Sequence, residues 1–347
     1  MRDSIFKQVS SDLKKILNDQ GFTGPEQATA TLAKSLAVVT PSLFQSGLCA
    51  GYPLRPSPNE YFVAQEFSAD REDLLKALEE AFKVFNLMPY RADQDILEGH
   101  ILCKIAAKLQ STLFGVFELT RSQNRNVYLE LGIAIGIGRP FVLVKESNAE
   151  LASLVEGLDY YNIQSYSVMK RELGARLREY VLSIAQYQTA NTATEEDGDD
   201  TYVIAHGGYD MPVDFALAIA ESLTSTHLHP VLIEAHSKQI EDAFRETGLP
   251  VPRILDAPSG SRLDAVVNAI RTARFGVYRI DADSSADVFL ALGVAIGLNK
   301  PWLLFKRDES NVPSDIRGLS ILSFRAFIDL QMQTSRRFED FLRINTH

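Results

Sequence analysis

Short apolar runs alternate with segments of helical periodicity along this chain of 347 residues. The pattern is clearest over 111–146, which reads STLFGVFELTRSQNRNVYLELGIAIGIGRPFVLVKE. It predicts a strand at 114–117, a helix at 126–137 and a strand at 141–144, because two continuous apolar runs flank a segment whose apolar residues recur every three or four positions. Continuous apolar strands are typical of a parallel sheet that is covered on both faces.

The same stretch occurs twice in the chain. Residues 273–306 repeat it without a gap at a constant offset of 161, so that Gly132 corresponds to Gly293. This extent of ungapped identity indicates a duplicated domain. One acidic position is not shared, because Glu130 in the first copy corresponds to Ala291 in the second.

Further strands and helices are predicted on both sides of this stretch in the first copy. Strands are expected at 61–64 and 87–90, and helices at 71–85, 99–109 and 167–185. Strands that alternate with helices of this length form right-handed βαβ units, which give a parallel sheet with helices on both faces.

The second copy begins at 202–205, which matches 61–64 at an offset of 141. The change of offset from 141 to 161 places twenty additional residues in the second copy, which we expect around 236–258. A last helix is predicted at 327–344. The predicted fold class is therefore α/β, with two tandem parallel-sheet domains.

Two segments lie outside the duplication. Residues 1–58 contain two predicted helices followed by a stretch rich in Gly, Pro and Ser. They are interpreted as a helical cap on the first copy or, alternatively, as a helix pair for a partner or for oligomerisation. Residues 188–200 are acidic and aperiodic, which is typical of a flexible linker. The predicted domains are 59–187 and 201–347.

Composition narrows the class of protein. Apolar residues make up 46% and charged residues 23%, as in globular domains. A net charge of −10 argues against nonspecific binding of nucleic acid, which needs a basic surface. No apolar leader and no membrane span is apparent, so we expect a cytoplasmic protein with no membrane partner. Cys49 and Cys103 are predicted to form neither a disulfide framework nor a zinc site.

Ligands of open α/β sheets bind at the carboxyl ends of the strands. The loops that follow 61–64, 87–90 and 114–117 meet at that edge and carry many polar residues. The candidate ligand contacts and catalytic residues in the first copy are Gln65, Glu66, Arg91, Asp93, Glu118, Thr120, Asn124, Asn126 and Glu130.

Glu118 and Glu130 are the candidates for chemistry. Two carboxylates in one site raise each other's proton affinity or divide nucleophile and acid/base roles. A glutamate that faces an anomeric carbon attacks it or stabilises its positive charge, and nucleoside N-glycosidic bonds break by similar chemistry. Alternatively, Glu130 is a solvated acid in the first turn of its helix, where it interacts with the helix dipole, and the asparagines are helix caps.

The sequence between Thr120 and Pro140 resembles the signature of the nucleoside 2-deoxyribosyltransferase-like and TIR-like superfamily. The matching residues are Thr120, Asn124-Arg-Asn126-Val, Glu130-Leu-Gly, Gly138-Arg-Pro140 and, upstream, Arg91-Ala-Asp93. The resemblance covers 60–185 and, more weakly, 201–345. Two positions depart from it, since Glu118 and Thr112 stand where such proteins often carry Asp.

The resemblance implies a flavodoxin-like (Rossmannoid) sheet that binds a nucleoside, nucleotide or NAD, with Glu130 acting on C1′ of the sugar. We expect no cofactor and no metal. The leading hypothesis is an enzyme whose first copy is catalytic and whose second copy is degenerate. The alternative is a noncatalytic nucleotide sensor that controls a partner in bacterial defence, such as antiphage defence, or in signalling. A third possibility is a structural pairing without ligand. A homo-oligomer or a regulatory partner is expected.

The second copy lacks the acid at Ala291 and has Asp287 in place of Asn126, so we do not expect it to perform the same reaction. It carries a candidate anion site after its first strand and at the start of a helix, where backbone N–H groups and a guanidinium suit a phosphate. The residues of this candidate site are His206, Gly207, Gly208, Ser259, Ser261 and Arg262. Alternatively, they are ordinary turn glycines and a helix cap.

Overall fold

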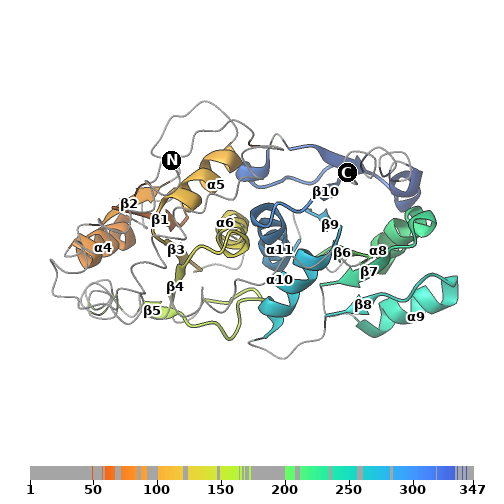
Figure 1. Ribbon diagram of the computed structural model, residues 1–347, viewed down its shortest axis with the longest axis horizontal. Coiled ribbons are helices and arrows are strands. Elements are labelled where there is room, and N and C mark those ends of the chain that lie inside the picture. Colours follow the sequence, from red (N-terminus) through yellow and green to blue (C-terminus); the bar gives the residue numbers. More distant parts are fainter. Residues whose placement is uncertain are drawn as a thin grey trace, which may run out of the picture. The chain divides into compact units, whose positions relative to one another are not determined.

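The computed structural model describes two sheets together with helices and loops that connect their strands (Figure 1). The described residues are 49, 57, 59–66, 72–83, 87–91, 101–119, 124–146, 149–163, 165, 168, 172, 200–207, 212–233, 237–255, 261–281, 284–317, 319–332, 334, 338 and 341. They belong to two compact units. The first unit comprises Met1–Leu151 and Asp159–Glu195, and the second comprises Ala152–Leu158 and Glu196–His347.

The first unit contains a parallel sheet with the strand order β2-β1-β3-β4-β5. The strands are β1 (Glu60–Ala64), β2 (Met88–Arg91), β3 (Gly115–Glu118), β4 (Phe141–Glu146) and β5 (Tyr161–Ile163). This is the flavodoxin order of a doubly wound sheet. The expected α/β fold is thus confirmed for the first copy.

Three described helices connect these strands: α4 (Glu72–Lys83), α5 (Ile101–Ser111) and α6 (Arg125–Gly136). Because connections between parallel strands are right-handed, α4 covers one face of the sheet and α5 and α6 cover the other. On the α4 face, the rings of Tyr61 and Phe114 stack at 5.4 Å, and Phe82 of α4 packs against both. On the other face, α5 packs against α6.

The second unit repeats this arrangement and extends it by one strand, giving the order β11-β10-β9-β6-β7-β8 with parallel neighbours throughout. Its strands are β6 (Thr201–Ala205), β7 (His229–Leu232), β8 (Arg253–Ile254), β9 (Phe275–Arg279), β10 (Trp302–Arg307) and β11 (Ile321–Phe324). Its helices are α8 (Pro212–Ser222), α9 (Ser237–Thr247), α10 (Arg262–Thr272), α11 (Ala286–Gly297) and the 3-10 turns η2 (Thr224–Thr226) and η3 (Ser314–Ile316).

The additional residues predicted around 236–258 account for the extra strand, since α9 and β8 both fall in this range. The core of the second unit is aromatic: Phe215 of α8 lies edge-on to Phe305 of β10 at 5.9 Å and is joined by Phe275 and Phe324. Both copies therefore build the same doubly wound sheet, and the second copy adds a helix and an edge strand to it.

Several predicted segments lie mostly or wholly outside the described residues. They are the two helices of 1–58, the linker 188–200 and most of the helices at 167–185 and 327–344. Val168 and Glu172 are helical, as are Phe327–Met332. Among the described residues, no helix has both the length and the apolar character needed to cross a membrane.

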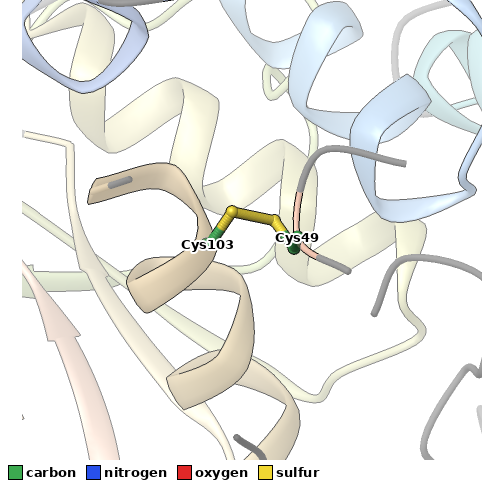
Figure 2. Close-up of a disulfide and its surroundings, with 2 residues drawn as sticks. All are labelled: Cys49 and Cys103. Carbon is green, nitrogen blue, oxygen red and sulfur yellow. A yellow bond between two sulfur atoms is a disulfide. The ribbon is translucent and has the colours of Figure 1, made fainter. Parts of the chain in front are cut away.

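The two cysteines form a disulfide, contrary to the expectation from the sequence (Figure 2). Cys103 lies in the first turn of α5 and Cys49 in the segment that precedes the first strand, with their Cα atoms 5.3 Å apart. Both side chains are buried. The pairing was not predicted because two cysteines 54 residues apart carry no spacing signal; only the fold brings them together. The N-terminal segment is thus covalently attached to α5.

Candidate functional site

Two polar residues lie side by side at the carboxyl edge of the first sheet, and a third lies on the same face two positions further back. The register pairs Val63 with Arg91 and Ala64 with Phe117, so its continuation by one residue brings Gln65 beside Glu118. Registered neighbours in a parallel sheet point to the same face, and side chains along a strand alternate between the faces. Gln65, Arg91 and Glu118 therefore belong to one face of the sheet, the face that α4 covers.

The candidate acids are buried rather than solvated. Glu118 is 3% exposed and Glu130 is 6% exposed. Gln65 is 5% exposed, and its Oε1 atom accepts no hydrogen bond from any residue that the structure describes. A carboxylate removed from water is costly unless charged or polar groups compensate it, so acids kept in such positions are candidates for function.

Glu130 lies in the second turn of α6, although the first turn was expected. Because α6 begins at Arg125, Glu130 is in the second turn, and its burial is inconsistent with a solvated acid at the helix start. Asn124 is the N-cap residue of α6, yet its side chain makes no capping hydrogen bond. Glu130 is therefore not solvated, as the helix-dipole alternative assumed, and the Asn124 side chain does not cap α6.

The other candidate residues of the first copy are distributed around the same edge. Asn124 and Asn126 are half-buried at the start of α6, which follows the carboxyl end of β3. Glu66 is half-buried in the position after Gln65, and Arg91 is half-buried at the end of β2. Asp93 and Thr120 lie outside the described residues. The role of each of these residues in binding a ligand stays a prediction.

The Gly138-Arg139-Pro140 part of the motif is structural. Gly138 has a φ of +69°, a backbone conformation that favours glycine, and the equivalent Asn299 has a φ of +54°. Arg139 is buried and donates from Nη2 to the carbonyl oxygen of Gln110 at 2.7 Å. Burial lowers the pKa of Arg139 to about 10. The turn thereby joins the end of α5 to the start of β4, at the sheet edge opposite the candidate acids.

The second sheet carries a different polar group at its carboxyl edge. Arg279, the residue equivalent to Glu118, is fully buried and its Nε atom lies 2.5 Å from Oδ2 of Asp281, which is also buried. The Oδ1 atom of Asp281 accepts from the backbone N–H of Arg307 at 2.6 Å. Ser284 completes the group, since its hydroxyl accepts from the N–H of Asp281 and donates to the carbonyl of Arg279.

This buried pair was missed in the sequence analysis, although the signal was present. The offset of 161 aligns Arg279 with Glu118, which is a reversal of charge at the end of a strand. A buried ion pair that is hydrogen-bonded to its own backbone is internally compensated. The second copy has thus replaced both candidate acids, Glu118 by Arg279 and Glu130 by Ala291.

Two of the residues predicted to bind an anion, His206 and Gly207, are packed inside the second unit. His206 occupies the position of Gln65 and is 1% exposed. Gly207 lies so close to the start of α11 that a Cβ atom would be 2.7 Å from the backbone nitrogen of Ser285. Glycine at this position therefore allows the loop to pack on the helix.

At the helix start predicted to bind the same anion, the Arg262 guanidinium is already hydrogen-bonded within the protein. Arg262 donates from Nη2 to the carbonyl of Ile233 at 3.2 Å and from Nη1 to the hydroxyl of Ser153 at 3.0 Å. Ser261 is the exposed N-cap residue of α10 and makes no side-chain capping bond. Gly208 and Ser259 lie outside the described part of the chain.

No family model matches the sequence, and no curated protein matches it.

Proposed function

We propose that the first unit is an enzyme that acts on the N-glycosidic bond of a nucleoside, a nucleotide or NAD, and that Glu130 is its central catalytic residue. The observation that carries the proposal is a glutamate that is only 6% exposed on the helix after β3, near the sheet edge where ligands of this topology bind. The resemblance of its surroundings to nucleoside 2-deoxyribosyltransferase-like and TIR-like proteins supports the same chemistry.

The reaction requires a negative charge near C1′ of the sugar. As the bond from C1′ to the base nitrogen breaks, its electron pair leaves with the base and C1′ becomes cationic. A carboxylate held away from water interacts strongly with that charge, and it needs little reorganisation when the charge develops. Glu130 either stabilises the cation or bonds to C1′. Water or a second base then bonds to C1′, and this step releases Glu130 where it had bonded.

Glu118 and Gln65 support this role in different ways. Glu118 provides a second buried acid, which exchanges a proton with the leaving base or with water. Gln65 carries a buried amide oxygen that accepts no hydrogen bond from the described residues, and it is suited to receive an N–H or O–H of the ligand. Arg91, on the same sheet face, suits a phosphate or another anionic group.

The test is release of free base by the purified full-length chain. Deoxynucleosides, nucleotides and NAD are incubated with the protein, and the free base or nicotinamide is quantified by chromatography. We expect Glu130→Gln to lower the rate by about 100-fold or more, because a positioned carboxyl group contributes about that factor. Glu72→Gln is the matched control, since Glu72 is an exposed acid in the first turn of α4. Equal rates for Glu130→Gln and the wild type would refute the mechanism.

A second candidate function is a noncatalytic nucleotide sensor that controls a protein partner, in bacterial defence or signalling. The replacement of both acids in the second copy favours this alternative, because the scaffold there is maintained without them. Calorimetry distinguishes the two: a sensor binds a nucleotide tightly, and the same nucleotide is recovered unchanged after prolonged incubation.

A further inference from the structure

A short segment that lies between two strands of the first sheet in sequence belongs to the second unit by its contacts. This segment, Ala152–Leu158, follows β4 and precedes β5. It forms a compact turn in which Val155 donates to the carbonyl of Ala152 at 3.1 Å and Leu158 donates to that of Val155 at 3.2 Å. Leu154 is 2% exposed and Val155 is fully buried, so the turn is packed rather than suspended in solvent.

The carboxylate of Asp287 binds the backbone of this turn. Its Oδ2 atom accepts from the N–H of Ser153 at 3.2 Å and from the Ser153 hydroxyl at 2.6 Å. Its Oδ1 atom accepts from the N–H of Leu154 at 2.8 Å. Hydrogen bonds to an ionised acceptor are stronger than neutral ones, and three of them fix both the position and the orientation of the turn.

Arg262 completes the contact from the other side. The Ser153 hydroxyl accepts from Nη1 of Arg262 while it donates to Asp287, so one hydroxyl links a guanidinium to a carboxylate. The second Arg262 nitrogen donates to the carbonyl of Ile233, which holds the guanidinium in place. The turn is thereby held by a pair of oppositely charged residues with complementary donors and acceptors.

These contacts lie at the carboxyl edge of the second sheet. Asp287 is in the first turn of α11, Arg262 is the first residue of α10, and Ile233 directly follows β7. Helices begin and strands end at this edge, which is where a ligand of a doubly wound sheet binds. A segment of the same polypeptide, Ala152–Leu158, therefore lies at the position in the second unit where a small ligand would be expected.

The charged pair is specific to the second copy. Position 126 of the first copy is Asn where the second has Asp287, and position 101 is Ile where the second has Arg262. Each copy thus carries residues that the other lacks. The first has Glu118 and Glu130, and the second has Asp287 and Arg262, the pair that binds the turn.

We propose that the carboxyl edge of the second sheet is a peptide-binding site occupied in cis by Ala152–Leu158, and that this segment blocks small-ligand binding there. The inference is independent of the proposed reaction, because it rests on contacts within the second unit. It also assigns a role to Asp287 and Arg262, which maintain the turn and do not contact a substrate.

The test is hydrogen–deuterium exchange of the full-length chain, followed at the amides of Ser153 and Leu154. In the wild type both amides are protected by Asp287. Asp287→Asn introduces the residue found at the equivalent position of the first copy and removes the charge and one acceptor. We expect exchange of the two amides to accelerate by at least about tenfold. Asp264→Asn, an exposed acid in the first turn of α10, is the matched control and leaves exchange unchanged.

A second variant keeps the test decisive if Asp287→Asn does not fold. Ser153→Ala removes only the hydroxyl that links Asp287 to Arg262, at a half-buried position. We expect a severalfold acceleration at the same amides. Protection equal to that of the wild type in a folded Asp287→Asn protein, or in Ser153→Ala where the first variant is unfolded, would overturn the proposal.

Discussion

Arg279 lies at the end of β9 where the equivalent Glu118 lies at the end of β3, so the two copies of one sheet carry side chains of opposite charge type at the same position of their carboxyl edge. The two side chains also differ in their surroundings. Arg279 is neutralised by Asp281 inside its own domain, whereas Glu118 shares its edge with Gln65 and the start of α6. The first copy is therefore the candidate enzyme, whereas the charged residue at the edge of the second copy is paired within its own unit.

The Arg279–Asp281 pair is expected to be important for the folding of the second unit. Both side chains are buried, and removal of one partner leaves the other charge without compensation. Asp281→Ala should therefore lower the free energy of unfolding by about 3–5 kcal/mol, measured by chemical denaturation. Asp242→Ala is the control, because Asp242 pairs with Arg245 on the exposed surface of α9. A loss of stability no larger than that of the control would contradict this account of the pair.

The disulfide predicts a response to reductant. The loop closed by Cys49 and Cys103 spans 54 residues, and the chain-entropy model gives such a crosslink about 4 kcal/mol of stabilisation. Treatment with dithiothreitol should lower the denaturation midpoint of the wild type. The double variant Cys49→Ser, Cys103→Ser should already show the lower midpoint and should not respond. A wild-type midpoint that is insensitive to complete reduction would show that the crosslink does not stabilise the first unit.

Asp315 predicts a dependence of stability on pH. Burial raises the pKa of this carboxyl group, and a hydrogen bond from the Ser314 hydroxyl partly offsets the rise. Since the folded state holds the proton more tightly than the unfolded state, this residue favours folding at low pH, and the contribution is lost as the pH rises above its ordinary pKa of 3.8. Asp315→Asn removes the effect. The stability of the variant relative to the wild type should increase between pH 4 and pH 7 in denaturation experiments, and a constant difference would exclude this origin.

The occupied edge of the second sheet predicts the stoichiometry of ligand binding. If the first unit binds a nucleoside, nucleotide or NAD as proposed, calorimetry should give one site per chain and not two, because Ala152–Leu158 covers the second edge. Asp287→Asn should leave the affinity of the first site unchanged. Two equivalent sites in the wild type would contradict the occupied-edge proposal without bearing on the role of Glu130.

Local periodicity was sufficient to predict most of the regular structure. The strands and helices between Glu60 and Glu146 are found within about two residues of their predicted bounds, because each apolar run is continuous and each helix has a distinct apolar face. The change of offset predicted twenty additional residues around 236–258, and the structure shows that they include α9 and β8. The strand β5 was not predicted, since a run of three residues with an exposed Asn162 at its centre gives too little signal.

The features that depend on long-range contacts were not predicted. The disulfide joins residues 54 positions apart, and Asp287 binds Ser153 and Leu154 more than 130 positions away. Neither contact leaves a periodic or spacing signal. The burial of Glu130 was also open from the sequence, because an acid near a helix start is as compatible with solvent as with a site. The charge reversal between Glu118 and Arg279 was readable from the alignment of the two copies.

The central claim is that Glu130 acts on the sugar and not merely in its binding. The most direct measurement compares Glu130→Gln with the wild type at saturating ligand, with the rate of base release and the ligand affinity determined on the same preparation. The account predicts that the rate falls by about 100-fold or more while the affinity changes little, because the amide retains the size of the carboxylate but not its charge. An unchanged rate, or a loss confined to affinity, would contradict it.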